Sequence, residues 1–305
     1  MKTKRGPAAL SAVLLGALGT APVHAQGLLN RLKDRLGPAG DVVETVIENR
    51  AAFEGFSEAE ELEIATKNSG QFEAQAPLWD DPLLDSYLNG IVQRLAEHAQ
   101  PRPFDYRIRV VSDPSVNAFT FGAGFLYVNA GLLARMENEA QVAMVLAHEI
   151  AHVAESHVTN GMKANAGINM LGQLAGQAAA SSGRIDYEVL QQTYHYSMNA
   201  AINGHGRSQE SDADELGLEY LFRAGYDPRE ASGTFEQLLK EHGDPSKREA
   251  FFYSSHPRNQ ERMERTNAWV ETKYASSLET GTWIVNTQEF QDLMRDLVAK
   301  MGEQD

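Results

Sequence analysis

The sequence predicts an α+β fold that is mostly helical, with one small antiparallel sheet placed directly before a buried helix. Three observations lead to this prediction. Along most of the 305 residues, apolar side chains recur every three or four positions, which is the period of an amphipathic helix. The segment 106–129 alternates with a period of two instead, which is typical of strands. The stretch "VLAHEIAHVAESH" at 145–157 then combines an apolar helical pattern with three histidines and two glutamates.

The first 25 residues have the pattern of a cleaved secretory signal peptide. Three basic residues at positions 2, 4 and 5 precede an apolar run at 8–18, and "PVHA" supplies small residues before Gln26. The apolar run is shorter than the roughly 20 residues that span a bilayer. No cysteine follows it, so we expect neither an anchor helix nor a lipoprotein. The expected location is the periplasm, with no transmembrane span in the mature chain.

The composition excludes some partners and sets an expected domain plan. A formal net charge of -15 repels nucleic acid and anionic lipid, so we expect polypeptide or small-molecule partners. The chain has no cysteine, and an exported chain without disulfides depends on packing, alone or with a metal. We expect a signal peptide at 1–25, a leader at 26–56, a main domain at 57–274, and a C-terminal strand and helix at 275–305 packed on that domain.

Two helices and three strands are expected before the histidine-rich stretch. Ser57 and Glu60 have the spacing of a capping box, which starts the first helix. The second covers about 81–98 and is stopped by "PRP". "YRIRV" alternates apolar and polar residues, and "VNAFTF" and "GFLYVN" follow it around the glycine turn "GAG". These three strands form the predicted antiparallel sheet.

The rest of the chain is expected to be helical. Asn138 and Gln141 have capping spacing for a helix that continues to about His157. Residues 161–183 repeat amide side chains every four positions, which indicates an amphipathic helix rather than a membrane span. Further helices are expected at about 186–202, 208–224, 228–241, 258–274 and 287–301, with the short strand "WIV" before the last.

The histidine pair in the buried stretch indicates a metal site. His148 and His152 are four residues apart and share one helical face, with Glu149 beside them. In the H-E-x-x-H arrangement, two neutral imidazoles hold Zn²⁺ and the glutamate takes a proton from the activated water. Paired histidines also occur as solvated or satisfied core residues. Here the helix is apolar, and burying His and Glu without a metal would be costly, so we expect one Zn²⁺ per chain.

A catalytic zinc needs a third protein ligand and one open position. The segment "RSQESDADELG" places Glu210 and Asp214 four apart on one helical face. Glu210 is the expected third ligand, and Asp214 the expected acceptor of an N–H from a ligand histidine. Alone, this acidic run would be read as a solvated face. Glu155 and Val158 stand where a metzincin has glycine and histidine, which excludes that class.

The order of these motifs resembles a known family. The matching segments are "NAF" at 117–119, a glycine-led strand at 124–128, "HEIAH" at 148–152, "ESDAD" at 210–214 and "HPRNQERMER" from His256. Together they resemble the HtpX/BepA-type zinc metallopeptidases, the gluzincin family that also includes the CAAX prenyl endopeptidases.

The resemblance implies a zincin-like fold and assigns roles to particular residues. His148, His152 and Glu210 would be the zinc ligands, and Glu149 would be the general base. Asp214 would accept a hydrogen bond from a ligand histidine. The strand around 124–129 would border the cleft, where an extended peptide adds by backbone pairing. The implied substrate-binding residues are Asn117, Gly124, Phe125 and Tyr127.

Three residues keep more than one interpretation. The resemblance gives His256 two roles, one catalytic, in which it stabilises the oxyanion, and one as a fourth ligand that keeps the enzyme latent. Arg262 matches a family arginine, for which a structural ion pair and a catalytic role both remain open. His157 also matches a family position, but we expect it to serve helix packing.

These expectations combine into one main function and one alternative. The main prediction is an exported zinc-dependent endopeptidase that hydrolyses peptide bonds in misfolded envelope proteins, with outer-membrane proteins among the expected substrates. The alternative is a chaperone-like or latent peptidase fold whose zinc site is closed by His256. The oligomeric state is not predicted.

Overall fold

The computed structural model describes residues 56–162, 206–239 and 260–303. The predicted signal peptide, the predicted leader apart from Phe56, the segment 163–205 and His256 lie outside these ranges. The elements, in chain order, are α5 (Glu58–Glu73), α6 (Pro82–Ala96), β1 (Arg107–Val111), β2 (Ala118–Gly122), β3 (Phe125–Asn129), α7 (Ala130–Leu133), α8 (Glu139–Ala154), α11 (Arg207–Arg223), α12 (Glu230–Leu239), α14 (Gln260–Trp269), the π-helix η1 (Val270–Tyr274), α15 (Ala275–Leu278) and α16 (Gln288–Gly302). None of the helices in the described ranges has the length and apolar character needed to cross a membrane.

The mostly helical α+β class is confirmed, but the sheet is mixed rather than antiparallel. Its strand order is β1-β3-β2. β2 and β3 pair antiparallel across the predicted glycine turn, whereas β1 runs parallel to β3. The turn requires glycine, because Gly124 has φ +85° and a Cβ there would lie 2.4 Å from the carbonyl oxygen of Asp105. The sheet therefore has β3 in the centre and β2 at one edge.

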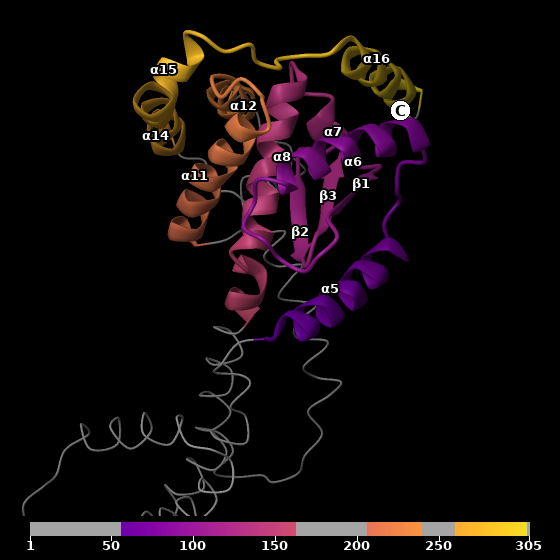
Figure 1. Ribbon diagram of the computed structural model, residues 1–305. Coiled ribbons are helices and arrows are strands. Elements are labelled where there is room, and N and C mark those ends of the chain that lie inside the picture. Colours follow the sequence, from indigo (N-terminus) through magenta and orange to yellow (C-terminus); the bar gives the residue numbers. More distant parts are fainter. Residues whose placement is uncertain (1–55, 163–205, 240–259, 304–305) are drawn as a thin grey trace, which may run out of the picture. The chain divides into compact units, whose positions relative to one another are not determined.

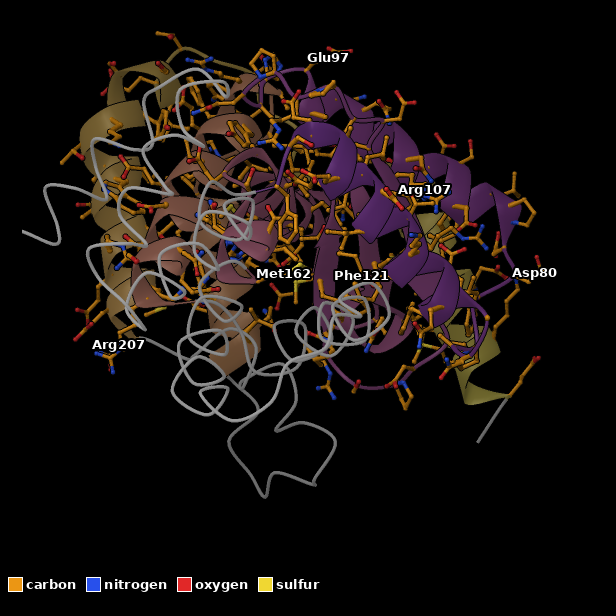
Figure 2. The ribbon with its side chains drawn as sticks, turned by 90° about the horizontal axis from the view of Figure 1, so that it is seen from below. Asp80, Glu97, Arg107, Phe121, Met162 and Arg207 are labelled. Atoms are coloured by element: carbon orange, nitrogen blue, oxygen red, sulfur yellow. The ribbon has the colours of Figure 1, made fainter. Side chains whose placement is uncertain are left out.

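Helix α5 covers one face of the sheet with an aromatic cluster. Its capping box of Ser57 and Glu60 is present as predicted. The ring of Phe72 lies 5.0–5.5 Å from those of Phe119, Phe121 and Tyr127. At the lower end of the fold, Met162 packs with Ile64 and Val158 in a small separate cluster, and Figure 2 looks onto this end with Met162 and Phe121 labelled.

Helix α8 lies at the centre of the fold, between the sheet and α11 (Figure 1). All of its residues are buried, because it packs against α6, α11, α12 and β2. Asn138 caps it by accepting a hydrogen bond from the backbone N–H of Gln141, as expected. The helix ends at Ala154 and does not continue to His157. Glu155 is its C-cap, and Ser156 has φ +53°.

The C-terminal segment braces the start of α8. The predicted strand "WIV" is a single bridge, between Ile284 and Tyr226. Beyond it, the side chain of Thr287 caps α16 and donates a hydrogen bond of 2.6 Å to the carboxylate of Glu139, in the first turn of α8. Tyr87 of α6 and Tyr226 also donate to this carboxylate, each at 2.8 Å. One buried carboxylate thus connects α8 with α6 and α16.

Candidate metal centre

The side chains of His148, His152 and Glu210 converge, although Glu210 lies 58 or more residues further along the chain. The Nε2 atoms of the two histidines are 3.0 Å apart. The Glu210 carboxylate lies 3.5 Å from each of them, through Oε2 to His148 and Oε1 to His152. All three residues are buried. Two imidazole nitrogens and a carboxylate oxygen therefore share one small, buried volume.

These distances fit a zinc ion. Zinc lies about 2.0–2.2 Å from histidine nitrogen and carboxylate oxygen, so two ligand atoms at the tetrahedral angle are about 3.4 Å apart. The separations of 3.0, 3.5 and 3.5 Å bracket that value. The three residues also form the group of His, Asp and Glu side chains in the described ranges whose ligand atoms all lie within 4.8 Å. The donor set and its spacing are therefore suitable for Zn²⁺ with three protein ligands.

Close packing of two helices produces this geometry. On α8, the four-residue spacing of the histidines places them one turn apart on the same face. On α11, Gly217 lies against the backbone of α8, and a Cβ at residue 217 would be 3.0 Å from the N atom and 3.1 Å from the Cα atom of His148. The missing side chain lets α11 approach closely enough for Glu210 to reach the histidines.

Asp214 lies directly behind His148. Its Oδ1 is 3.2 Å from the Nδ1 of that ring, so it is placed to receive the N–H opposite the ligand nitrogen, as the sequence predicts. Burial alone would lower the pKa of His148, but hydrogen bonds to Asp214 and Glu210 together with their charges raise it to about 9. A carboxylate in this position fixes the tautomer and raises the basicity of a ligand histidine.

Arg262 makes an ion pair with both acidic residues of the site. It holds Asp214 through two parallel hydrogen bonds, from Nε at 2.8 Å and Nη2 at 2.6 Å, and its Nη1 lies 2.9 Å from Oε2 of Glu210. Burial would raise the pKa of Asp214, but the charge of Arg262 and the hydrogen bonds to His148 and Arg262 lower it. Asp214 is therefore ionised. Of the two interpretations of Arg262, the structural ion pair is present, and a catalytic role stays a prediction.

Glu149 and His157, two further residues of the 145–157 stretch, lie in different surroundings. Glu149, the predicted general base, follows His148 directly and is 2% exposed. His157 does not merely pack against the helix, because its Nδ1 lies 2.8 Å from the Nδ1 of His152. Burial lowers the pKa of His157 to about 4, against the charge of Asp212, which raises it. Sequence reasoning missed this contact because it assumed that α8 continues to residue 157.

The strand that contains Phe125 and Tyr127, two of the predicted substrate-binding residues, is not at an edge of the sheet. β3 is hydrogen-bonded to β1 on one side and β2 on the other, so a peptide cannot pair with it, and that expectation is wrong. Tyr127 is 1% exposed, and its hydroxyl donates to Glu73 of α5. Asn117 and Phe125 are buried as well, and Gly124 belongs to the turn. A role of these residues in binding stays a prediction, as does that of His256, which lies outside the described ranges.

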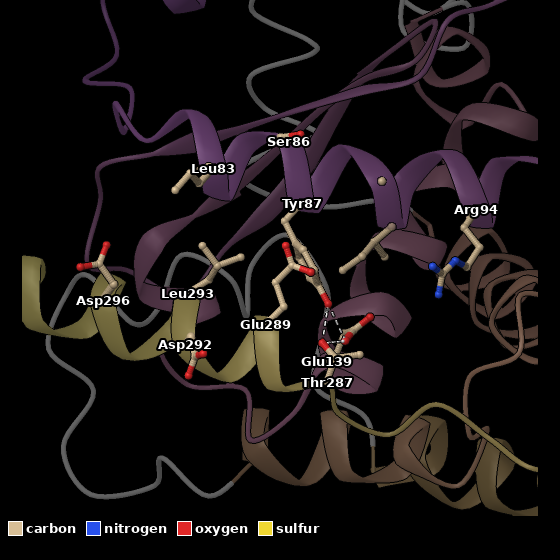
Figure 3. A pocket seen from close by; sticks show the side chains of 12 residues that line it. Leu83, Ser86, Tyr87, Arg94, Glu139, Thr287, Glu289, Asp292, Leu293 and Asp296 are labelled. Atoms are coloured by element: carbon tan, nitrogen blue, oxygen red, sulfur yellow. Dashed lines mark hydrogen bonds between the residues drawn. The ribbon is translucent and has the colours of Figure 1, made fainter.

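A cavity of about 1050 Å³ lies between α6 and α16, away from the predicted ligands. Figure 3 shows Tyr87 in its wall, bonded to Glu139 and Thr287. Two acidic residues of α16 that line it are paired with neighbours, Asp292 with Arg295 and Asp296 with Lys300. The lining contains none of the predicted site residues, so the chemistry of the molecule is expected at the histidine cluster.

Comparison with known proteins identifies the family. The model of peptidase family M48 matches residues 82–270, more than half of the chain. The chain belongs to peptidase family M48. The matched range contains all the predicted ligands together with Glu149, Asp214 and Arg262. The zinc metallopeptidase family that the sequence resembles is thereby confirmed.

Members of the M48 family with similar sequences come from bacteria and eukaryotes. The beta-barrel assembly-enhancing protease of Escherichia coli (strain K12) is 29% identical over 208 residues, which cover 67% of this chain and 42% of that protein. The metalloprotease LoiP of the same strain is 29% identical over 178 residues, covering 58% of this chain and 67% of LoiP. The mitochondrial metalloendopeptidase OMA1 of Arabidopsis thaliana is 33% identical over 159 residues, covering 52% of this chain and 30% of that protein. The chain thus spans less than half the length of the first of these relatives.

Proposed function

We propose that this chain is a zinc-dependent endopeptidase with His148, His152 and Glu210 as its metal ligands. The observation that carries the proposal is the convergence of two Nε2 atoms and a carboxylate at 3.0–3.5 Å inside the protein. Three protein ligands leave a fourth position for water or substrate, which is the arrangement of catalytic rather than structural zinc. When bound, zinc polarises the scissile carbonyl and brings the pKa of water to about 7.

The residues of the chain supply the remaining steps. Glu149 accepts the proton of the attacking water and later delivers it to the leaving amine, as a general base and then a general acid. Asp214 holds the ring of His148 in the ligand tautomer, and Arg262 fixes Asp214 and Glu210. For the substrate, we propose antiparallel or parallel pairing along β2, because this edge strand contacts α8 and extended peptides bind at sheet edges.

The biological setting is proposed from the sequence and the relatives. The basic and apolar start of the chain resembles an export signal, so we propose a periplasmic location. The name of the Escherichia coli relative links that protein to β-barrel assembly. By analogy, we propose that misfolded outer-membrane proteins are among the substrates of this chain.

Two substitutions test the mechanism. Glu149→Gln keeps the shape of the side chain but removes the proton acceptor, so we expect zinc content equal to that of the wild type and a loss of casein cleavage of about 10²-fold or more. Glu210→Ala removes a ligand, so we expect both zinc and cleavage to be lost. Metal analysis of the purified proteins, with one zinc per chain expected in the wild type, is the measurement.

Other outcomes of these measurements would contradict the proposed mechanism. Casein cleavage that persists in Glu149→Gln would show that this carboxylate is not the base. A wild-type protein without zinc, or a Glu210→Ala variant that retains it, would remove the basis of the proposed activity.

A further inference from the structure

We propose that His157 positions the ligand His152 by accepting a hydrogen bond from its Nδ1–H. The inference deepens the proposed zinc site and rests on it. The Nε2 of His152 faces His148 and Glu210, while its Nδ1 lies 2.8 Å from the Nδ1 of His157. The ring of His152 is fully buried and thus held between the ligand cluster on one side and a second imidazole on the other.

The direction of this hydrogen bond follows from the ligand role. A neutral imidazole that gives its Nε2 lone pair to a metal carries its hydrogen on Nδ1. His152 is therefore the donor, and Nδ1 of His157 is the acceptor. Ligand histidines generally donate this N–H to a carboxylate, a carbonyl or water. Here His148 faces a carboxylate, that of Asp214, whereas His152 faces a ring nitrogen.

The break in the helix after α8 makes the contact. In an uninterrupted α-helix, a residue five positions further on is turned by about 500°, which leaves it about 140° away from the starting side chain. His157 would then point away from His152. The left-handed conformation of Ser156, with φ +53°, changes the chain direction between the two histidines.

A partly buried ion pair holds this break in place. Arg102 donates to the Oγ of Ser156 at 2.5 Å and to the carboxylate of Glu61 at 2.5 Å. Glu61 belongs to α5 and is 3% exposed. From α11, the side chain of Gln209 donates to the backbone carbonyl of His157 at 3.4 Å. The acceptor is thus supported from two sides, by Arg102 through Ser156 and by Gln209, which directly precedes the ligand Glu210 in α11.

Two substitutions of His157 separate the hydrogen bond from packing. His157→Leu replaces the ring with an apolar side chain and removes the acceptor, so we expect zinc affinity to fall by roughly 10–100-fold. His157→Asn places its Oδ1 at the same number of bonds from the backbone as Nδ1, so we expect it to restore most of that affinity. Affinity is measured by competition with a chromophoric chelator, and the absorption spectrum of the Co²⁺-substituted protein reports the ligand geometry. We expect an altered spectrum for the Leu variant and a nearly unchanged one for the Asn variant.

Val158→Ala is the matched control for lost stability. Val158 is the next residue and is 1% exposed, and it packs with Ile64 and Met162 away from the ligands. We expect it to lower the Tm without changing zinc affinity. If His157→Leu and His157→Asn bind zinc as tightly as the wild type, the proposal is wrong, although the zinc site stands. A wild-type protein that binds no zinc would contradict the proposed function itself.

The zinc-loaded wild type offers a test that needs no variant. In NMR spectra of ¹⁵N-histidine-labelled protein, we expect the Nδ1 of His152 to carry a slowly exchanging hydrogen and the Nδ1 of His157 to carry none. A hydrogen on the Nδ1 of His157 would make it a donor and overturn the proposal, even if the Leu variant fails to fold.

Discussion

Arg262 is the residue on which the charge balance of the site depends. Its guanidinium contacts both Asp214 and Glu210, and all three residues are buried. A buried charge that loses its partner typically costs about 3–5 kcal/mol. The arginine is therefore expected to stabilise the two carboxylates both in the metal-free protein and in the proposed zinc-bound one.

Replacement of Arg262 by leucine tests this role. In Arg262→Leu, buried Glu210 loses its arginine and buried Asp214 keeps only the partly exposed Arg265, so we expect the free energy of unfolding in EDTA to fall by about 3–5 kcal/mol. Arg265→Leu is the control, because Arg265 makes one hydrogen bond to Asp214 and its side chain is 33% exposed. We expect a loss below about 1 kcal/mol there. Urea unfolding measures both, and equal losses would show that Arg262 has no special role.

Asp227 gives the stability of the protein a defined pH dependence. Burial would raise the pKa of Asp227, but hydrogen bonds from the side chain and backbone of Arg229, and its charge, lower it below 3.8. Because the folded state has the lower pKa, the stabilisation is present above pH 3.8 and is lost as the pH falls through the folded value. We expect Asp227→Asn to lose less stability than the wild type between pH 6 and pH 3, measured by urea unfolding in EDTA. Parallel losses in the two proteins would contradict the assignment.

Among the elements, the contact of α8 with α11 sets the geometry of the site. Gly217→Ala would place a methyl group 3.0–3.2 Å from backbone atoms of His148 and Ala147. Backbone cannot give way as a flexible side chain does, so we expect a destabilisation of about 1–3 kcal/mol and weaker zinc binding, measured by urea unfolding and chelator competition.

A second helical glycine provides a control, because its replacement by alanine is expected to raise stability rather than lower it. A Cβ at Gly90, inside α6, would meet no atom within 4 Å. Gly90→Ala removes the helix penalty of glycine, so we expect a gain of about 0.5–1 kcal/mol. Similar effects of the two substitutions would mean that the close approach of α11 is unimportant.

The sequence predicts those features that depend on local spacing. The capping box at Ser57, the start of α8 at Asn138 and the four-residue intervals of the ligands are local, and all of them appear in the structure. The direction of β1 is not local, because parallel and antiparallel strands share the same period of two. The contact of His157 with His152 depends on where α8 ends, and the apolar pattern continues past that point. The position of β3 in the centre of the sheet depends on strand order, for which the sequence carries no direct signal.

For the whole molecule, the proposed zinc ion would join two distant parts of the chain. Two of its protein ligands come from α8 and the third from α11. Because only the folded chain brings them together, bound zinc favours the folded state over the unfolded chain. We expect EDTA to lower the Tm and added Zn²⁺ to restore it, with a gain of about 2.7 kcal/mol when free zinc is 100 times its Kd. Differential scanning calorimetry measures the change. Glu210→Ala should not respond to either reagent, and a wild-type Tm that is unaffected by EDTA would argue against the site.

The helix with the histidines is fastened at both of its ends. At the first turn, Glu139 is bonded to Tyr87, Tyr226 and Thr287, and just past the last turn Ser156 is bonded to Arg102. Segments with many buried contacts open least often, so this helix keeps two ligands and the proton acceptor in fixed positions relative to one another. The site is therefore expected to stay assembled when other parts of the molecule open locally.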